Sequence, residues 1–254
     1  MLGAIGGDIV GSRFEGHPSP PPGFELFHRG CRFTDDTVCT LAVADALLRK
    51  EDFASSLRRY VRRYPDRGYG GMFLRWAMAD DAPPYGSWGN GAPMRVAGIG
   101  WLADGADDAR AMARAQAAVS HDHADAMAAA EAVAWAIHLL LNGHSARDVR
   151  RRLESEFGYD LDPGSALLPR GFDVSAAGTV EPALAAALHV GDWETAVRSV
   201  VGLGGDTDTL ACIAGGVAEA AYGLPENIAD RVVSYLTPDL LHVVDAFRGR
   251  LART

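Results

Sequence analysis

Cysteine is scarce in this chain, and its spacing matches no redox or zinc motif. The 254 residues include three cysteines, Cys31, Cys39 and Cys212, an odd number without a CxxC pair. That pattern favours a reducing compartment and simple packing roles for the thiols. We therefore expect a cytoplasmic protein without a disulfide framework.

Signals for export, membrane insertion and broad nucleic-acid binding are also missing. Residues 1–7 lack a basic region before an apolar stretch and are followed by Asp8, so no signal peptide is expected. No window approaches 18 uninterrupted apolar residues, which predicts no membrane span. The net charge of −9 argues against nucleic acid as a partner, because such binding depends on Lys and Arg. A small anionic ligand held by backbone amides remains compatible with this charge.

Strand patterns are scarce, whereas helical patterns occur along most of the chain. Alternating β-branched runs are few, and apolar residues recur at steps of three and four. We expect helices over residues 40–49, 53–64, 107–119, 123–141, 146–157, 181–189, 193–201, 209–222, 226–235 and 239–251. The loops at 17–24 and 79–91 are rich in proline. The prediction is a single all-α domain over residues 1–254.

The sequence lacks the GxSxG and Cys/His signatures of nucleophilic hydrolases, and two short acidic motifs are its most distinctive feature. The first acidic motif consists of Thr34, Asp35, Asp36 and Thr37. The second consists of Asp206, Thr207, Asp208 and Thr209. Each begins an apolar, helix-like run, and only Arg32 lies near enough in sequence to neutralise the first. Four carboxylates and four hydroxyls are suitable oxygen ligands for a hard divalent cation, provided that the fold brings both motifs together.

Helix capping is the alternative explanation for both motifs. Thr and Asp accept hydrogen bonds from the free amides at a helix start, where negative charge also complements the helix dipole. Two adjacent aspartates repel each other, however, and the second adds little to a cap. In the second motif, aspartates two residues apart can converge on one cation, and Gly204 and Gly205 allow a tight turn and a close approach to a ligand. No twelve-residue acidic loop follows, which excludes an EF-hand.

Two further segments carry candidate site residues. Glu15 stands just before the first proline-rich loop, where it could act as an acid, a base or a substrate clamp, or simply face solvent. The segment 87–95 is rich in glycine and opens a helix. Its free amides could hold a phosphate or a sugar hydroxyl, and a simple turn is the alternative.

The histidines near residue 121 and the N-terminal glycines have competing explanations. His121 could donate a hydrogen bond to a ligand, or Ser120 could cap the following helix. Zinc is less well supported, since no further ligand lies at suitable spacing. A dinucleotide fingerprint at the N-terminus would need a preceding strand, so close helix packing better explains Ala4, Gly7 and Gly11.

Taken in order, four segments resemble the motifs of the ADP-ribosylglycohydrolase family. They are residues 3–12 together with Glu15, residues 33–37, residues 89–95 and residues 204–209. The resemblance implies an all-α, orthogonally packed multi-helix bundle with two Mg²⁺ or Mn²⁺ ions. The metal ligands that it implies are Thr34, Asp35, Asp36, Asp206, Asp208 and Thr209. The implied catalytic residues are Glu15, Asp35 and Asp206, and the substrate-binding residues are Ser87, Gly89, Asn90, Gly91, Met94, His121, Gly204 and Gly205.

The resemblance also implies a reaction, which is hydrolysis of the glycosidic bond between ADP-ribose and a modified side chain. Two hard cations can hold the distal ribose and orient water for attack at its anomeric carbon. We expect an arginine linkage first. The alternatives are an O-linked substrate (serine-linked ADP-ribose, O-acetyl-ADP-ribose or poly-ADP-ribose), a non-catalytic ADP-ribose-binding protein and a nucleotide phosphatase. The expected partner is an ADP-ribosylated protein or an ADP-ribose-containing small molecule, bound by a monomer.

Overall fold

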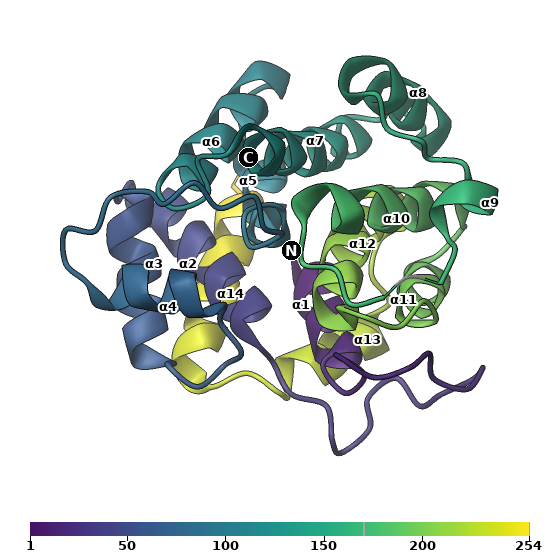
Figure 1. Cartoon of the computed structure of the whole chain (residues 1–254), viewed down its shortest axis with the longest axis horizontal. Helices are drawn as coiled ribbons and strands as arrows, with labels where there is room; N and C mark the ends of the chain where they lie inside the picture. The colour runs from purple at the N-terminus through teal and green to yellow at the C-terminus, as the bar shows by residue number, and fades with distance from the viewer. Residues whose placement is uncertain (170, 254) are drawn as a thin grey trace.

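The computed structural model describes residues 1–169 and 171–253, which form a bundle of helices (Figure 1). The described residues contain no β-strand, and only an isolated bridge joins Gly89 to Ser175. The elements are α1 (Leu2–Gly11), α2 (Asp35–Arg49), α3 (Phe53–Arg63), α4 (Gly71–Met78), η1 (Pro93–Arg95), α5 (Ala97–Leu102), α6 (Ala106–Ala118), α7 (Ala124–Leu141), α8 (Ala146–Phe157), α9 (Pro163–Ala166), α10 (Ala176–His189), α11 (Trp193–Val201), α12 (Thr207–Tyr222), α13 (Glu226–Val233) and α14 (Pro238–Leu251). The predicted all-α fold is confirmed.

The predicted helices are all present, but two of them begin well before the predicted residue. Helix α2 begins at Asp35, directly after its cap, because the first acidic motif forms its first turn. Helix α10 begins at Ala176, where Ser175 accepts a hydrogen bond from the amide of Gly178, and it continues through Pro182. Sequence analysis also did not delimit α1, α4, α5 and α9, which are short or rich in glycine.

Helices α1 and α12 lie side by side in the middle of the bundle, in direct backbone contact (Figure 1). A Cβ atom added to Gly7 would lie 1.8 Å from the carbonyl oxygen of Ala211. At Gly11 it would lie 2.3 Å from the carbonyl oxygen of Thr207. Residues four apart share one face of a helix, so these glycines form a continuous contact surface. The close helix packing predicted for this segment is confirmed at both positions.

This contact brings the acidic motifs together. Helix α1 carries Asp8 on one turn and packs Gly11 against the first turn of α12, which contains the second acidic motif. The carboxylate of Asp8 in turn accepts hydrogen bonds from the start of α2, which contains the first acidic motif. Three helix segments from opposite ends of the chain therefore meet at one point.

Helix α7 is the one described helix that is long and apolar enough to cross a membrane, judged by length and composition alone. Its mean hydropathy is 1.4, and 72% of the helix is buried inside the bundle. It packs against α6, α10 and α12. Its apolar character is thus matched by its position as a core helix.

Candidate active site

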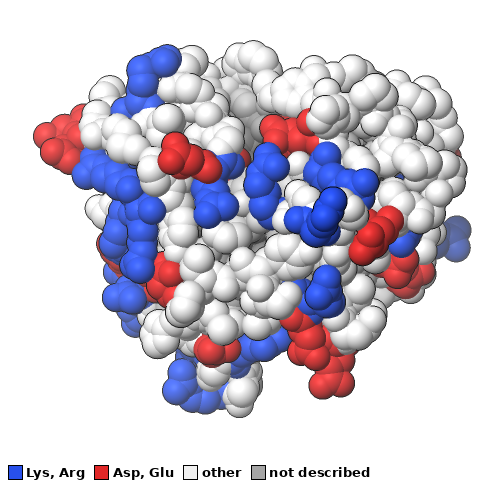
Figure 2. Space-filling model, turned by 90° about the horizontal axis from the view of Figure 1, so that it is seen from below, with Lys and Arg blue, Asp and Glu red and all other residues white. Residues whose placement is uncertain are grey.

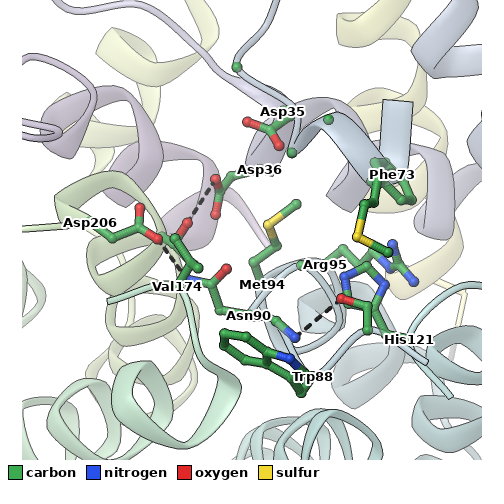
Figure 3. Close-up of a pocket in the computed structure, with 18 of the residues that line it drawn as sticks. Asp35, Asp36, Phe73, Trp88, Asn90, Met94, Arg95, His121, Val174 and Asp206 are labelled. Carbon is green, nitrogen blue, oxygen red and sulfur yellow. Dashed lines mark hydrogen bonds between the residues drawn. The ribbon is translucent and has the colours of Figure 1, made fainter. Parts of the chain in front are cut away.

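A cavity of about 480 Å³ opens at the N-termini of α2 and α12 (Figure 3). Its volume is within the usual range for small-molecule sites. The predicted site residues that line it are Glu15, Asp35, Asp36, Ser87, Gly89, Asn90, Gly91, Met94, His121, Asp206, Asp208 and Thr209. Three predicted residues, Thr34, Gly204 and Gly205, are outside this lining.

The first acidic motif both caps α2 and faces the cavity. The hydroxyl of Thr34 accepts a hydrogen bond from the amide of Asp36 at 3.3 Å, so the capping explanation holds for this residue. Asp36 is buried, and its Oδ2 accepts from the hydroxyl of Thr209 at 3.2 Å. Its Oδ1 is also buried but has no hydrogen-bond partner in the described structure. Capping and cation binding are therefore compatible here, because the hydroxyl oxygen of Thr34 caps the helix and Oδ1 of Asp36 would bind the cation.

Asp8 anchors this motif from α1. Its Oδ2 accepts hydrogen bonds from the amides of Thr34, at 3.0 Å, and Thr37, at 3.1 Å, and from the Thr37 hydroxyl. Its Oδ1 accepts from the Thr34 hydroxyl at 2.7 Å. Burial raises the pKa of Asp8 to about 6, and these hydrogen bonds oppose that rise. Sequence analysis assigned Asp8 no role, although a single aspartate within an apolar, glycine-rich segment was a usable signal.

The second acidic motif does not act as a side-chain cap. Asp206 is the residue before α12, but its side chain accepts no hydrogen bond from the first turn of that helix. Its Oδ2 instead accepts from the side-chain amide of Asn90 at 2.6 Å. The preceding Gly204 and Gly205 have φ values of 75° and 80°, a left-handed conformation that glycine adopts without strain. These two glycines shape the turn into α12, and they do not line the cavity.

The acidic side chains converge closely enough to hold a cation. Two sets of three side chains each bring one carboxylate oxygen per residue within 4.8 Å of the others in the set. The first set is Asp8, Asp36 and Asp208, and the second is Glu15, Asp206 and Asp208. None of these carboxylates forms an ion pair with a Lys or Arg in the described part of the chain. The donor set consists of oxygens only, which suits Mg²⁺ or Mn²⁺. The buried Oδ1 of Asp36 is the clearest sign that these residues fit a cation.

Electrostatics agrees with this arrangement. Burial first, and then repulsion by Asp8, raises the pKa of Asp36 well above its ordinary value. Burial and the neighbouring carboxylates also raise the pKa of Asp35 and of Asp208. Burial and Asp206 raise the pKa of Glu15, whereas Arg32 lowers it. Ionising this cluster without a positive charge is costly, and a divalent cation removes that cost.

The glycine-rich segment is held in place by residues that precede α10. The amide of Asn90 donates to the carbonyl of Val174 at 2.8 Å, and the amide of Ala176 donates to the carbonyl of Trp88 at 3.0 Å. Asn90 thus connects the predicted substrate segment to Asp206 through its side chain and to Val174 through its backbone. Sequence analysis did not find the exposed apolar side chains at the cavity mouth, which are Met72, Trp88, Phe172 and Val174.

His121 lines the wall opposite the aspartates in the view of Figure 3. Burial first, and then the charge of Arg95, lowers the pKa of His121 well below its usual value, so the ring is neutral at pH 7. The alternative in which Ser120 caps α7 is wrong, because His123 caps that helix by accepting from the amide of Asp125. The hydroxyl of Ser120 instead lies 2.8 Å from Nδ1 of His121.

The family assignment rests on a match along nearly the whole chain. The sequence profile of the ADP-ribosylglycohydrolase family matches residues 1–253. The chain belongs to the ADP-ribosylglycohydrolase family. The resemblance noted from four motifs is confirmed, and the chain is a member of a hydrolase family.

Individual relatives of this ADP-ribosylglycohydrolase family member agree with the profile. ADP-ribosylhydrolase ARH3 of Homo sapiens is 28% identical in an alignment 326 positions long, which covers 95% of this chain and 90% of that protein. ADP-ribosylhydrolase ARH3 of Mus musculus is 28% identical in an alignment 308 positions long, which covers 89% of this chain and 83% of that protein. A solved structure titled "ADP-ribosylglycohydrolase-related protein complex" superposes with a TM-score of 0.75 at 27% identity, covering 97% of this chain and 95% of that one.

Proposed function

We propose that this ADP-ribosylglycohydrolase family member is a divalent-cation-dependent hydrolase that releases ADP-ribose from O-linked substrates. The observation that carries the proposal is the cluster of buried carboxylates without ion pairs at a cavity of about 480 Å³. The similarity to proteins named ADP-ribosylhydrolase ARH3 favours the O-linked alternative over the arginine linkage that we expected first.

The cation site would use the residues that sequence analysis named. Asp35, Asp36, Asp206, Asp208 and Thr209 line the cavity, and Thr34 completes the predicted set of ligands for two Mg²⁺ or Mn²⁺ ions. When bound, such ions supply positive charge that can hold ribose hydroxyls and activate water. Asp8 lies behind the ligands and fixes the first acidic motif, and Asn90 fixes Asp206.

Glu15 is the residue best suited to proton transfer. It is half-buried at the cavity, where burial and the charge of Asp206 raise its pKa above the ordinary value, and a carboxyl group at this place can donate or accept a proton. The charge of Arg32 acts on the same carboxylate.

The charge of the chain supports a protein or small-molecule substrate rather than nucleic acid. The loop between α1 and α2 runs along the lower edge of Figure 1, and Figure 2 shows that lower face. Basic and acidic side chains both occur on that face. The net charge of −9 favours an ADP-ribosylated protein or a small ADP-ribose derivative as the partner.

The proposal can be tested with two matched peptides, one serine-linked and one arginine-linked to ADP-ribose. We expect release of ADP-ribose from the serine-linked peptide in Mg²⁺ or Mn²⁺, and none after chelation with EDTA. Asp208→Ala is the matched inactive protein. Release from the arginine-linked peptide alone would contradict the O-linked assignment. Release of phosphate from a nucleotide, without free ADP-ribose, would support a phosphatase instead.

A further inference from the structure

The guanidinium of Arg95 is buried without a negative partner. The residue is 0% exposed and lines the far wall of the cavity. Its Nε donates to the side-chain oxygen of Gln116 at 2.5 Å, and one terminal nitrogen donates to the backbone oxygen of Gln116 at 3.0 Å. The other terminal nitrogen, Nη1, is buried without a hydrogen-bond partner in the described structure. No carboxylate of the described residues pairs with it.

Such a charge is unusual, because arginine stays protonated in proteins and an unpaired buried charge is strongly destabilising. Sequence analysis placed Arg95 at the end of the glycine-rich segment but gave it no function. Its described partners include neutral acceptors and the ring of Phe73, whose centroid lies 5.5 Å from the guanidinium carbon.

A hydrogen-bond relay connects Arg95 to the cavity. The same terminal nitrogen that donates to Gln116 also donates to the hydroxyl oxygen of Ser120 at 3.1 Å. That hydroxyl lies 2.8 Å from Nδ1 of His121, and Ser120 is fully buried. If Nδ1 carried the imidazole proton, the Ser120 hydroxyl would accept twice and its own hydrogen would have no acceptor among its described contacts. Leaving a buried donor unpaired is costly, so Ser120 donates to Nδ1.

This relay fixes the tautomer of His121. The ring is neutral, and with Nδ1 as an acceptor its proton must lie on Nε2. Nε2 has no hydrogen-bond partner among the described residues, and it faces the glycine-rich segment: a Cβ atom on Gly91 would lie 2.8 Å from it. The rings of Phe73 and Tyr85, at 5.9 Å and 5.8 Å, flank the imidazole. His121 therefore presents one N–H group to the cavity, beside Arg95 (Figure 3).

We propose that Arg95 and Ser120 are positioning residues that hold His121, which the family resemblance already names as a substrate-binding residue, as an Nε2–H donor for the diphosphate of the substrate. The imidazole would donate to one of the diphosphate oxygens, and the diphosphate would lie on the cavity side of the relay that begins at Arg95. Gly91 packs closely against the imidazole, since a larger residue there would collide with the ring. The choice of a diphosphate rests on the proposed function, whereas the relay itself does not.

The relay is tested first without any substrate. Nitrogen-15 NMR of histidine-labelled protein distinguishes protonated from unprotonated ring nitrogens. We expect His121 to carry its proton on Nε2 in the wild-type protein, with or without Mg²⁺. In Ser120→Ala, we expect the two tautomers to become mixed. A proton on Nδ1 in the wild-type protein overturns the relay, whatever the protein hydrolyses.

The ligand is tested next with a matched pair of variants. The side-chain nitrogen of His121→Gln can reach the position of Nε2, whereas that of His121→Asn lies nearer the position of Nδ1. A hydrogen bond to a charged group contributes enough that its loss should weaken binding by about tenfold or more. By calorimetry we therefore expect His121→Asn to weaken ADP-ribose binding by about tenfold and His121→Gln to restore most of it. Adenosine, which lacks the diphosphate, should bind all three proteins equally.

Kinetics provides the remaining readout. We expect KM to rise in His121→Asn and in Arg95→Lys while kcat changes little, because the proposed contact is remote from the bond that breaks. Equal weakening of ADP-ribose and adenosine, or no weakening in His121→Asn, overturns the diphosphate contact. If the wild-type protein has the Nε2–H tautomer but binds no ADP-ribose, both the proposed function and the diphosphate contact are wrong. The hydrogen-bond relay from Arg95 to His121 would still be correct in that case.

Discussion

The backbone contact between α1 and α12 can be tested with a single added methyl group. In Gly7→Ala, the new Cβ would lie 1.8 Å from the carbonyl oxygen and 2.3 Å from the carbonyl carbon of Ala211. Both are backbone atoms, so the overlap can be relieved only by moving one helix. Overpacking of a core usually costs about 1–3 kcal/mol, whereas alanine is about 1 kcal/mol better than glycine inside a helix. Because backbone must move, we expect a net loss of about 2 kcal/mol.

The matched control is Gly249→Ala on α14. A Cβ atom there has no neighbouring atom within 4 Å, so only the helix preference should matter. We expect a gain of about 0.5–1 kcal/mol. A change of 1 kcal/mol shifts the midpoint of thermal unfolding by about 2–4 °C in a chain of this size. The predicted shifts in Tm are therefore a fall of about 4–8 °C for Gly7→Ala and a rise of about 1–4 °C for Gly249→Ala.

The same pair of variants tests whether the helix contact builds the site. Displacement of α12 moves Asp208 away from Asp36, so Mg²⁺ should raise the Tm of Gly7→Ala less than that of the wild-type protein. Its effect on Gly249→Ala should match wild type. Circular dichroism melts with and without Mg²⁺ measure both quantities. A Gly7→Ala protein as stable as Gly249→Ala would refute the reasoning.

Three further predictions concern the cluster. Asp36→Ala and Asp208→Ala should each abolish the rise in Tm that Mg²⁺ or Mn²⁺ produces, as well as hydrolysis; retention of both effects would contradict the cation site. Burial and mutual repulsion raise the pKa of Asp36 and Asp208, so the folded, cation-free protein binds more protons than the unfolded chain and becomes less stable as pH rises through the raised pKa values. A cation competes with those protons, so its stabilising effect should grow as the pH rises, as melts at several pH values would reveal. Asn90→Ala removes the 2.6 Å hydrogen bond to Asp206, and denaturant titration should show a loss of about 1.5–3 kcal/mol with weaker Mn²⁺ binding.

The parts of the fold that local sequence determines were predictable. Helix α8 has Ser145 as its cap and Gly158 after its last turn, and its predicted ends are the observed ones. The first acidic motif was expected to precede a helix at residues 40–49, whereas α2 already begins at Asp35 within the motif. Pro182 misled the prediction of α10, since a proline within a helix usually marks a boundary and here the helix continues through it.

The contacts between distant segments were not predictable from one sequence. Asp8 matters because it accepts four hydrogen bonds from the turn at residues 34–37, and no local pattern encodes that partner. Nothing in the sequence distinguished Arg95 from its neighbours. That no carboxylate of the described residues pairs with it becomes visible only in the folded structure, where residues from distant segments surround it. Phe172 and Val174 reach the cavity through backbone pairing between residues 88–90 and 174–176.

The hydrogen bond between Thr209 and Asp36 joins residues that are 173 positions apart. A cation held by the same two motifs would bind only when both ends of the chain are in place, and would act as a reversible cross-link between them. Ligand binding of this kind stabilises the folded state by about 2.7 kcal/mol when the free ligand is at a hundred times its dissociation constant. Opening either α2 or α12 would release the cation, so hydrogen exchange in both helices should slow together on its addition. The free energy of local opening would then be the same for the helices that carry the two motifs, and it would depend on the concentration of free metal ion in solution.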